Sequence, residues 1–218
     1  MAGAVAGFTA LGEAFYERGH VTATILLIRH AAHSHLGRIL SGRTPDITLS
    51  DEGVRQALTL AEHLGSLALN AIHTSPVQRA RETAQALAAP HGQTMRVVDA
   101  LNELDFGDWS GRAFEELEGD PAWSVWNQER ATAVPPHGES MADAQTRAWQ
   151  HVEQTALASP GQTIAMVSHC DIIRALVSRV LGLSLDNYGR FDIDPASCTR
   201  IAVGAWGAKV LSMNETYP

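Results

Sequence analysis

Residues 24–30, TILLIRH, carry a run of apolar and β-branched side chains that stops abruptly at Arg29 and His30. A continuous apolar run of this length, bounded by polar residues, is typical of a strand buried on both faces of a sheet. In an open α/β sheet, ligands bind beyond the carboxyl ends of the strands. The stretch therefore predicts a central strand that presents Arg29 and His30 at a ligand-binding edge.

Strand-like and helical segments alternate along the rest of the chain. Further strand-like runs follow at residues 70–73, 95–98, 163–167 and 199–213, the last as a hairpin. Helical patterns separate them and begin near Ser50, Ser75, Glu139 and Asp171. This alternation predicts an α/β fold with a mostly parallel sheet wound by right-handed crossovers.

The length of 218 residues is most simply that of one domain. We expect residues 1–22 to form an N-terminal extension and residues 23–218 to form a single domain. The least regular part, residues 112–138, contains Pro135 and Pro136 and is predicted to be a lid.

Composition narrows the class of partner. A net charge of −8 disfavours nucleic acid and anionic membranes. No apolar run approaches the roughly 20 residues of a membrane helix. Two cysteines do not make a disulfide framework, and the first residues lack the basic start of a secretory signal, so we expect a cytoplasmic protein.

Basic side chains follow three of the predicted strands. Arg29 and His30 follow the first, Arg79 lies one turn into the helix after the second, and His169 follows residues 163–167. The backbone N–H of Cys170 would also point at an anion from a helix start. Two arginines and two histidines at one sheet edge predict a cationic pocket that suits a phosphoryl group. By position alone, Arg81 competes with Arg79.

Four sequence blocks resemble motifs of the histidine phosphatase superfamily, branch 1, which has the phosphoglycerate mutase-like fold. They are Arg29-His30, SPVQRARETA, NELDFGDWSG and VSHCDIIRAL, in order within residues 25–181. The third block is most similar to α-ribazole phosphatases and broad-specificity phosphatases. The resemblance implies a three-layer sandwich with helices on both faces of the sheet.

The same resemblance implies a role for five residues. His30 would be the nucleophile that forms a phosphohistidine, while Arg29, Arg79 and His169 would hold the phosphoryl oxygens. Glu103 would be the general acid and then the general base, with Asp105 and Asp108 as the alternatives. We expect partial burial beside Phe106 and Trp109 to raise the pKa of Glu103, against its cationic neighbours.

The loop after His30 departs from the family pattern. Ala31 stands in place of a glycine, Cys170 in place of another glycine, and no asparagine occupies its usual position. The phosphate contact of that asparagine would pass to Ser34, to Arg43 or to a histidine, with Arg43 favoured.

The sequence thus predicts a phosphatase that needs no metal or other cofactor and acts on a small phosphorylated metabolite; a homodimer is left open. A phosphoglycerate-type mutase and a catalytically silent phospho-ligand binder are alternatives. A third is a metal site at the tract formed by His30, His33 and His35, although no partner follows at a familiar spacing.

Overall fold

The computed structural model describes residues 22–217, so the predicted N-terminal extension lies outside the described residues except for Thr22. A six-stranded sheet has the order β3-β2-β4-β1-β5-β6. Its strands are β1 (Ala23–Arg29), β2 (Ala71–Thr74), β3 (Met95–Val97), β4 (Thr163–Ser168), β5 (Cys198–Gly204) and β6 (Gly207–Glu215). The first four are parallel, and the β5–β6 hairpin adds two antiparallel strands at one edge. The predicted α/β fold with a mostly parallel sheet is confirmed.

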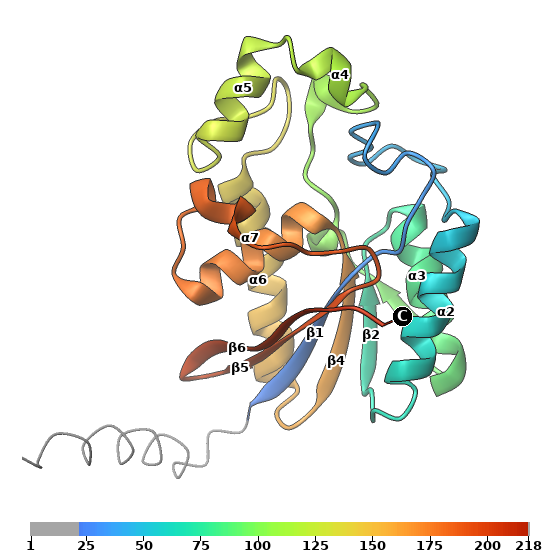
Figure 1. The fold of residues 1–218 in the computed structure, drawn as a ribbon. Coiled ribbons are helices and arrows are strands. Elements are labelled where there is room, and N and C mark those ends of the chain that lie inside the picture. Colours follow the sequence, from blue (N-terminus) through green and yellow to red (C-terminus); the bar gives the residue numbers. More distant parts are fainter. Residues whose placement is uncertain (1–21, 218) are drawn as a thin grey trace, which may run out of the picture.

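Helices cover both faces of the sheet (Figure 1). They are α2 (Asp51–Leu64), α3 (Gln78–His91), α4 (Phe114–Leu117), α5 (Pro121–Gln128), α6 (Met141–Ala158) and α7 (Cys170–Leu181), with short 3₁₀ turns at Asp99–Leu101, Gly107–Trp109 and Leu185–Arg190. Ile25 and Leu27 of β1 pack with α6 and α7, whereas Leu26 and Ile28 pack with α2 and α3. Because successive side chains of a strand point to opposite faces, the unbroken apolar run supplies both cores. The three layers follow from it.

The helix starts are fixed by local hydrogen bonds. Ser50 Oγ accepts the Gly53 N–H at 3.1 Å before α2, and Ser140 Oγ accepts the Asp143 N–H at 3.0 Å before α6. Such caps satisfy backbone donors that the first helical turn leaves free. A side chain at Gly53 would overlap the carbonyl oxygen of Ala32, so this glycine lets α2 pack against the loop after β1.

The register of the parallel strands brings the ends of β1, β2 and β4 together. Arg29 of β1 pairs with Ser168 of β4, and the His30 N–H donates to the Ser168 carbonyl at 2.9 Å. The Ser75 N–H, just after β2, donates to the Val167 carbonyl at 3.0 Å. Residues that follow these strands are therefore neighbours at one edge of the sheet.

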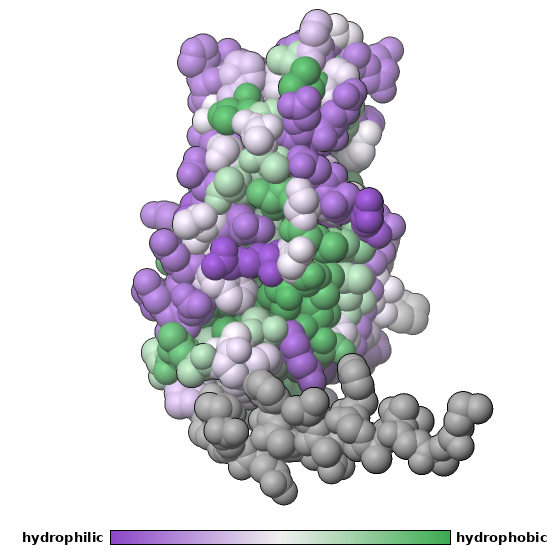
Figure 2. Space-filling model, turned by 90° about the vertical axis from the view of Figure 1, so that its left-hand side faces the viewer, coloured by the Kyte–Doolittle hydropathy of each residue, from purple (hydrophilic) through white to green (hydrophobic). Residues whose placement is uncertain are grey.

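The predicted lid lies above this edge as α4, α5 and the chain around them (Figure 1). The side chain of Trp126 is fully buried in the core, which anchors α5. Figure 2 shows that hydrophobic residues gather on the lower half of one side face, while the upper part is mixed. None of the helices within residues 22–217 combines the length and apolar character that crossing a membrane requires.

Candidate active site

His30 lies at the floor of a cavity of about 310 Å³ and is almost fully buried. Its Nδ1–H donates to the Ala31 carbonyl at 2.8 Å, and its Nε2 accepts from Nε of Arg79 at 3.1 Å. Burial, followed by the charges of Arg79 and Arg29, holds the pKa of His30 well below its usual value. The imidazole is therefore neutral at pH 7, and the lone pair of its Nε2 accepts the Arg79 Nε–H.

Arg29 and Arg79 supply the positive charge of the cavity. Arg29 Nη1 donates to the Ile193 carbonyl at 2.6 Å, and Arg79 Nη2 donates to the Gly42 carbonyl at 2.7 Å. The Nε atom of Arg29 and the Nη1 atom of Arg79 are buried without a hydrogen-bond partner. Within residues 22–217, neither guanidinium is within ion-pair distance of a carboxylate. Buried charges without counter-ions indicate an anion-binding site.

His169 lies beside His30, with ring centroids 5.1 Å apart. Its Nε2 is 2.7 Å from Ser75 Oγ, and its Nδ1 is 3.3 Å from Arg79 Nη2. Burial is the largest reason that the pKa of His169 is also well below its usual value. The two imidazoles thus face one site from the ends of β1 and β4.

Glu103 lies on the same site, with Oε2 3.8 Å from Nδ1 of His169. Burial, with a smaller contribution from Asp171, raises the pKa of Glu103 to about 8, and the neighbouring arginines oppose the shift. Burial raises the pKa of Glu103, as the sequence predicted, whereas the contribution of Asp171 was not predicted. The carboxyl group therefore carries a proton at neutral pH.

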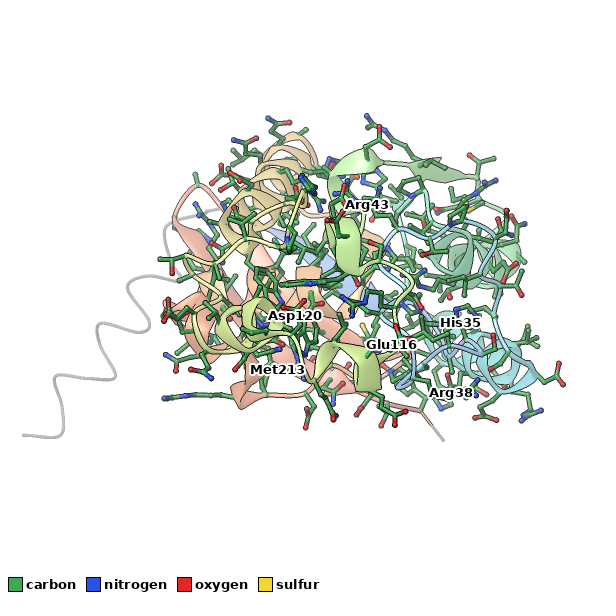
Figure 3. The ribbon with its side chains drawn as sticks, turned by 90° about the horizontal axis from the view of Figure 1, so that it is seen from above. His35, Arg38, Arg43, Glu116, Asp120 and Met213 are labelled. Atoms are coloured by element: carbon green, nitrogen blue, oxygen red, sulfur yellow. The ribbon has the colours of Figure 1, made fainter. Side chains whose placement is uncertain are left out.

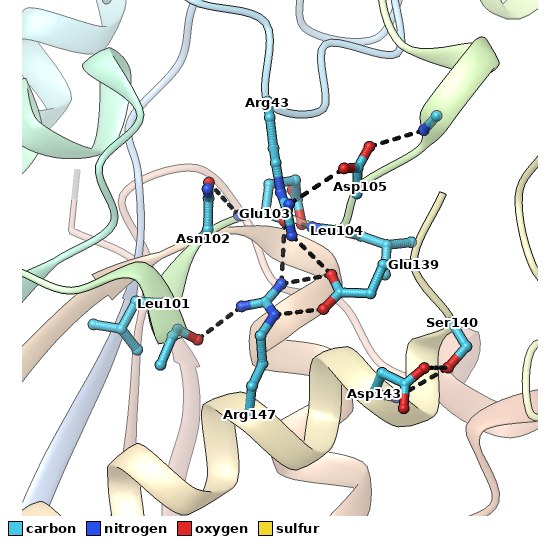
Figure 4. Close-up of polar contacts among 12 residues, drawn as sticks. Arg43, Leu101, Asn102, Glu103, Leu104, Asp105, Glu139, Ser140, Asp143 and Arg147 are labelled. Atoms are coloured by element: carbon cyan, nitrogen blue, oxygen red, sulfur yellow. Dashed lines mark hydrogen bonds and ion pairs between the residues drawn. The ribbon is translucent and has the colours of Figure 1, made fainter. Parts of the chain in front are cut away.

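The backbone at Glu103 is held by two arginines (Figure 4). Arg43 Nε donates to the Glu103 carbonyl at 2.8 Å, and Arg147 Nη2 donates to it at 3.1 Å. Both guanidinium groups also bind the carboxylate of Glu139. Arg43 makes a further ion pair with Asp105 at 3.3 Å.

Two predicted substrate contacts lie away from the cavity wall. The Arg43 side chain binds the Glu103 carbonyl and the carboxylates of Asp105 and Glu139. The Ser34 side chain is exposed to solvent. From the same loop, His33 lines the cavity instead, with its ring centroid 5.4 Å from that of His30. A histidine was among the expected substitutes for the missing asparagine.

Side chains from the segment predicted to be a lid line the outer part of the cavity: Phe114, Trp123, Asn127 and Arg130. The N–H of Phe114 donates to the Arg38 carbonyl at 3.0 Å, which ties α4 to the loop after β1, seen from above in Figure 3. The outer wall includes three residues that the sequence did not single out as site residues: Arg130, Asp171 and Tyr188. Asp171 lies within the VSHCDIIRAL motif, which was the available signal, whereas no pattern marked the other two.

Residues 25–216 match the model of the histidine phosphatase superfamily, branch 1. The chain belongs to this superfamily. It is 34% identical over 180 residues to a 2,3-bisphosphoglycerate-dependent phosphoglycerate mutase of Bartonella bacilliformis, covering 74% of this chain and 82% of the relative. It is 31% identical to phosphoserine phosphatase 1 of Hydrogenobacter thermophilus, covering 88% and 92%. An adenosylcobalamin/α-ribazole phosphatase of Escherichia coli is 25% identical, covering 88% and 90%.

The fold of this histidine phosphatase is similar to that of Bacillus stearothermophilus YhfR, with a TM-score of 0.84 and 26% identity over 89% of this chain and 98% of that one. The predicted family and the phosphoglycerate mutase-like fold are therefore confirmed.

One residue at the cavity differs from the family pattern. Cys170 lines the cavity at the start of α7, and burial raises the pKa of its thiol to about 11, so the side chain is a neutral, small wall residue. Among the described residues, no three side chains of the metal-binding types His, Cys, Asp and Glu converge as a metal ion requires, and His30, His33 and His35 do not.

Proposed function

We propose that this member of the histidine phosphatase superfamily hydrolyses small phosphomonoesters through a phosphohistidine on His30, with Glu103 as general acid and then general base. One observation carries the proposal: a neutral His30 and a protonated Glu103 line the same cavity as two arginines that lack counter-ions. These are the protonation states that the first chemical step requires.

In the first step, the Arg79 Nε–H leaves Nε2 of His30 and donates to a phosphoryl oxygen of the bound ester. The freed lone pair of Nε2 then attacks phosphorus, and the bond from phosphorus to the ester oxygen breaks. Glu103 transfers its proton to the leaving oxygen, so an alcohol departs and a carboxylate remains. Nδ1–H of His30, bonded to the Ala31 carbonyl, stabilises the positive charge that develops on the ring. Arg29 and Arg79 offset the charge on the phosphoryl oxygens, the role for which many phosphotransferases use Mg²⁺.

In the second step, the Glu103 carboxylate accepts a proton from water while the water oxygen attacks phosphorus. The bond between phosphorus and Nε2 breaks, and orthophosphate leaves with His30 neutral again. His169 supports both steps from behind the cavity wall, where its Nδ1, 3.3 Å from Nη2 of Arg79, orients the guanidinium that binds these oxygens. Each of these two displacements at phosphorus has a lower barrier than the direct displacement of the alcohol by water.

The experiment is to trap the intermediate. Enzyme mixed with a ³²P-labelled monoester and quenched in alkali should carry about one phosphoryl group, stable to base and labile to acid. His30→Ala should carry none and have no turnover, while His63→Ala, an exposed histidine on α2, should behave as wild type. Ester binding without a trapped group would mean a silent binder.

A phosphomutase is the second candidate, because a mutase is among the relatives. Orthophosphate released steadily without a bisphosphate primer supports the phosphatase, whereas isomerised ester with little orthophosphate supports the mutase. Full activity in EDTA is also expected. The cytoplasmic location and the homodimer stay predictions.

A further inference from the structure

The charges that line the cavity fall into two groups. The deep group, Arg29 and Arg79, has no carboxylate partner within residues 22–217, and the nearby Glu103 is protonated. The outer group is a pair: Nη1 of Arg130 lies 3.6 Å from Oδ1 of Asp171. The deep end therefore carries an excess of about two positive charges, while the outer end is neutral.

Arg130 is held firmly in its pair. Its guanidinium lies 3.9 Å from the centroid of the Tyr188 ring and 4.8 Å from that of Trp126, and its Nη2 donates to Asn127 Oδ1 at 2.7 Å. Stacking on two aromatic faces and a hydrogen bond fix its position against Asp171. The Nε and Nη1 atoms of Arg130 have no hydrogen-bond partner. The Arg130 side chain is only 5% exposed, against 19% for Asp171, so an anionic group of a ligand would meet the Asp171 carboxylate before it reaches Arg130.

The remaining outer wall is apolar. It consists of Leu36, Ile39, Leu40, Phe114, Trp123 and Tyr188, and the amide of Asn127 is a neutral polar group there. The His33 ring adds no charge, because burial and the charge of Arg79 lower its pKa to about 4. Apolar and aromatic walls favour a ligand that is itself apolar or aromatic at that end.

We infer that the substrate is the phosphate ester of an uncharged alcohol with an apolar or aromatic portion, and that Asp171 rejects esters whose alcohol carries a carboxylate. The inference rests on the proposed function, because it takes the phosphoryl group to bind at the deep end. A phosphomonoester dianion matches the two unpaired arginines, and the third arginine of the wall, Arg130, is already paired with the more exposed Asp171 carboxylate. Like charges at the outer end then oppose a carboxylate.

Three phosphate esters of primary alcohols test separately the repulsion of a carboxylate and the preference for an apolar group. Glycerol 3-phosphate and 3-phosphoglycerate differ only in a hydroxymethyl group against a carboxylate, and 2-phenylethyl phosphate adds an aromatic ring. At pH 7 we expect kcat/KM to be highest for 2-phenylethyl phosphate and at least about tenfold lower for 3-phosphoglycerate than for glycerol 3-phosphate. Leu36→Ala, on an exposed loop, should lower the ratio of 2-phenylethyl phosphate to glycerol 3-phosphate by about threefold.

The Asp171→Asn variant tests whether the Asp171 carboxylate causes the preference for glycerol 3-phosphate over 3-phosphoglycerate. It removes the repelling charge and frees Arg130, so the preference for glycerol 3-phosphate over 3-phosphoglycerate should shrink by at least about fivefold. Any general effect on Glu103 cancels in this ratio. Asp192→Asn, an exposed carboxylate paired with Arg174 and outside the cavity wall, should leave the ratio unchanged.

The outcomes are distinct. Equal or faster turnover of 3-phosphoglycerate would overturn the inference, make Arg130 a second anion site and leave the proposed function intact. A preference that Asp171→Asn does not alter would overturn the role of Asp171. If no ester releases phosphate and no phosphohistidine forms, the proposed function fails and the inference fails with it.

Discussion

Arg43 and Arg147 donate to the same carbonyl oxygen, that of Glu103, at 2.8 and 3.1 Å. Both also bind the Glu139 carboxylate, so Arg43, Glu139 and Arg147 form a clamp on the backbone that carries the proposed general acid (Figure 4). Arg147 further donates to the Ala100 carbonyl at 2.8 Å. The clamp fixes the position of Glu103 without contacting substrate.

Arg147→Ala should therefore weaken proton transfer more than phosphate binding. We expect kcat for an alkyl phosphate to fall about tenfold, a part of the 10²–10⁴-fold that a general acid contributes, with little change in KM. For p-nitrophenyl phosphate, whose leaving group needs no proton, the fall should be much smaller. Arg200→Ala, which removes a surface pair with Glu215, is the matched control. Equal losses on both esters would count against the clamp.

Glu103→Gln should remove the general acid itself. Turnover of an alkyl phosphate should fall about 10²–10⁴-fold, and turnover of p-nitrophenyl phosphate should be limited by the second step, because no base remains to activate water. Rapid-quench measurements should then show a burst of nitrophenol and an accumulated phosphohistidine. Wild-type rates for Glu103→Gln would transfer the role to another residue, with Asp105 the next to test.

The pH profile follows from the protonation states of the free enzyme. The pKa of Glu103 is raised to about 8, so the required proton is lost above that value, and kcat/KM should decline as the pH rises through about 8. His30, with its pKa well below the usual value, stays a nucleophile at mildly acidic pH. Glu103→Gln should abolish the alkaline decline, and its persistence in that variant would assign it to another group.

Stability should depend on pH through a second pair of histidines. Nδ1 of His73 in β2 lies 3.0 Å from Nε2 of His151 in α6. Burial, followed by the charge of His151, lowers the pKa of His73 to about 4. Below pH 6.5, His73 becomes protonated in the unfolded chain but stays neutral in the folded chain. His73 should therefore contribute a loss of stability of up to about 1.4 kcal/mol for each pH unit between 6.5 and 4, beside the losses that the other buried histidines contribute.

His73→Gln should remove this part of the dependence. Denaturant unfolding at pH 7 and pH 5 should give a smaller loss on acidification for the variant than for wild type. His63→Gln, on an exposed site, should keep the wild-type loss. Identical losses in all three proteins would show that His73 is protonated at no cost in the folded state.

Much of the site was predictable because it depends on local pattern. The carboxyl ends of parallel strands lie at the same edge of the sheet, so polar residues that follow one buried strand are close to those that follow its neighbours. Arg29, His30, Arg79 and His169 could therefore be grouped from the sequence, and the motif similarity added Glu103. In the structure Arg29, His30, Arg79 and Glu103 line one cavity. His169 is fully buried and lies behind the cavity wall, next to His30 and Arg79.

The contacts of Arg43 were not predictable by this route. Its partners Glu103 and Glu139 lie 60 and 96 residues further along the chain, and no periodicity links them. A long guanidinium reaches whichever carbonyl or carboxylate the fold places near it. The sequence placed Arg43 near the site, but competition among distant acceptors directed it to the Glu103 backbone.

The sequence by itself determined the order of strands and helices, the edge of the sheet that carries the site, and the residue types available there. These follow from side-chain periodicity and capping, which act over a few residues. Only the tertiary structure decided which charges are paired: Arg130 with Asp171, but Arg29 and Arg79 with no carboxylate among residues 22–217. Ion pairing depends on distance in space, and distance in space is set by packing between segments far apart in the chain.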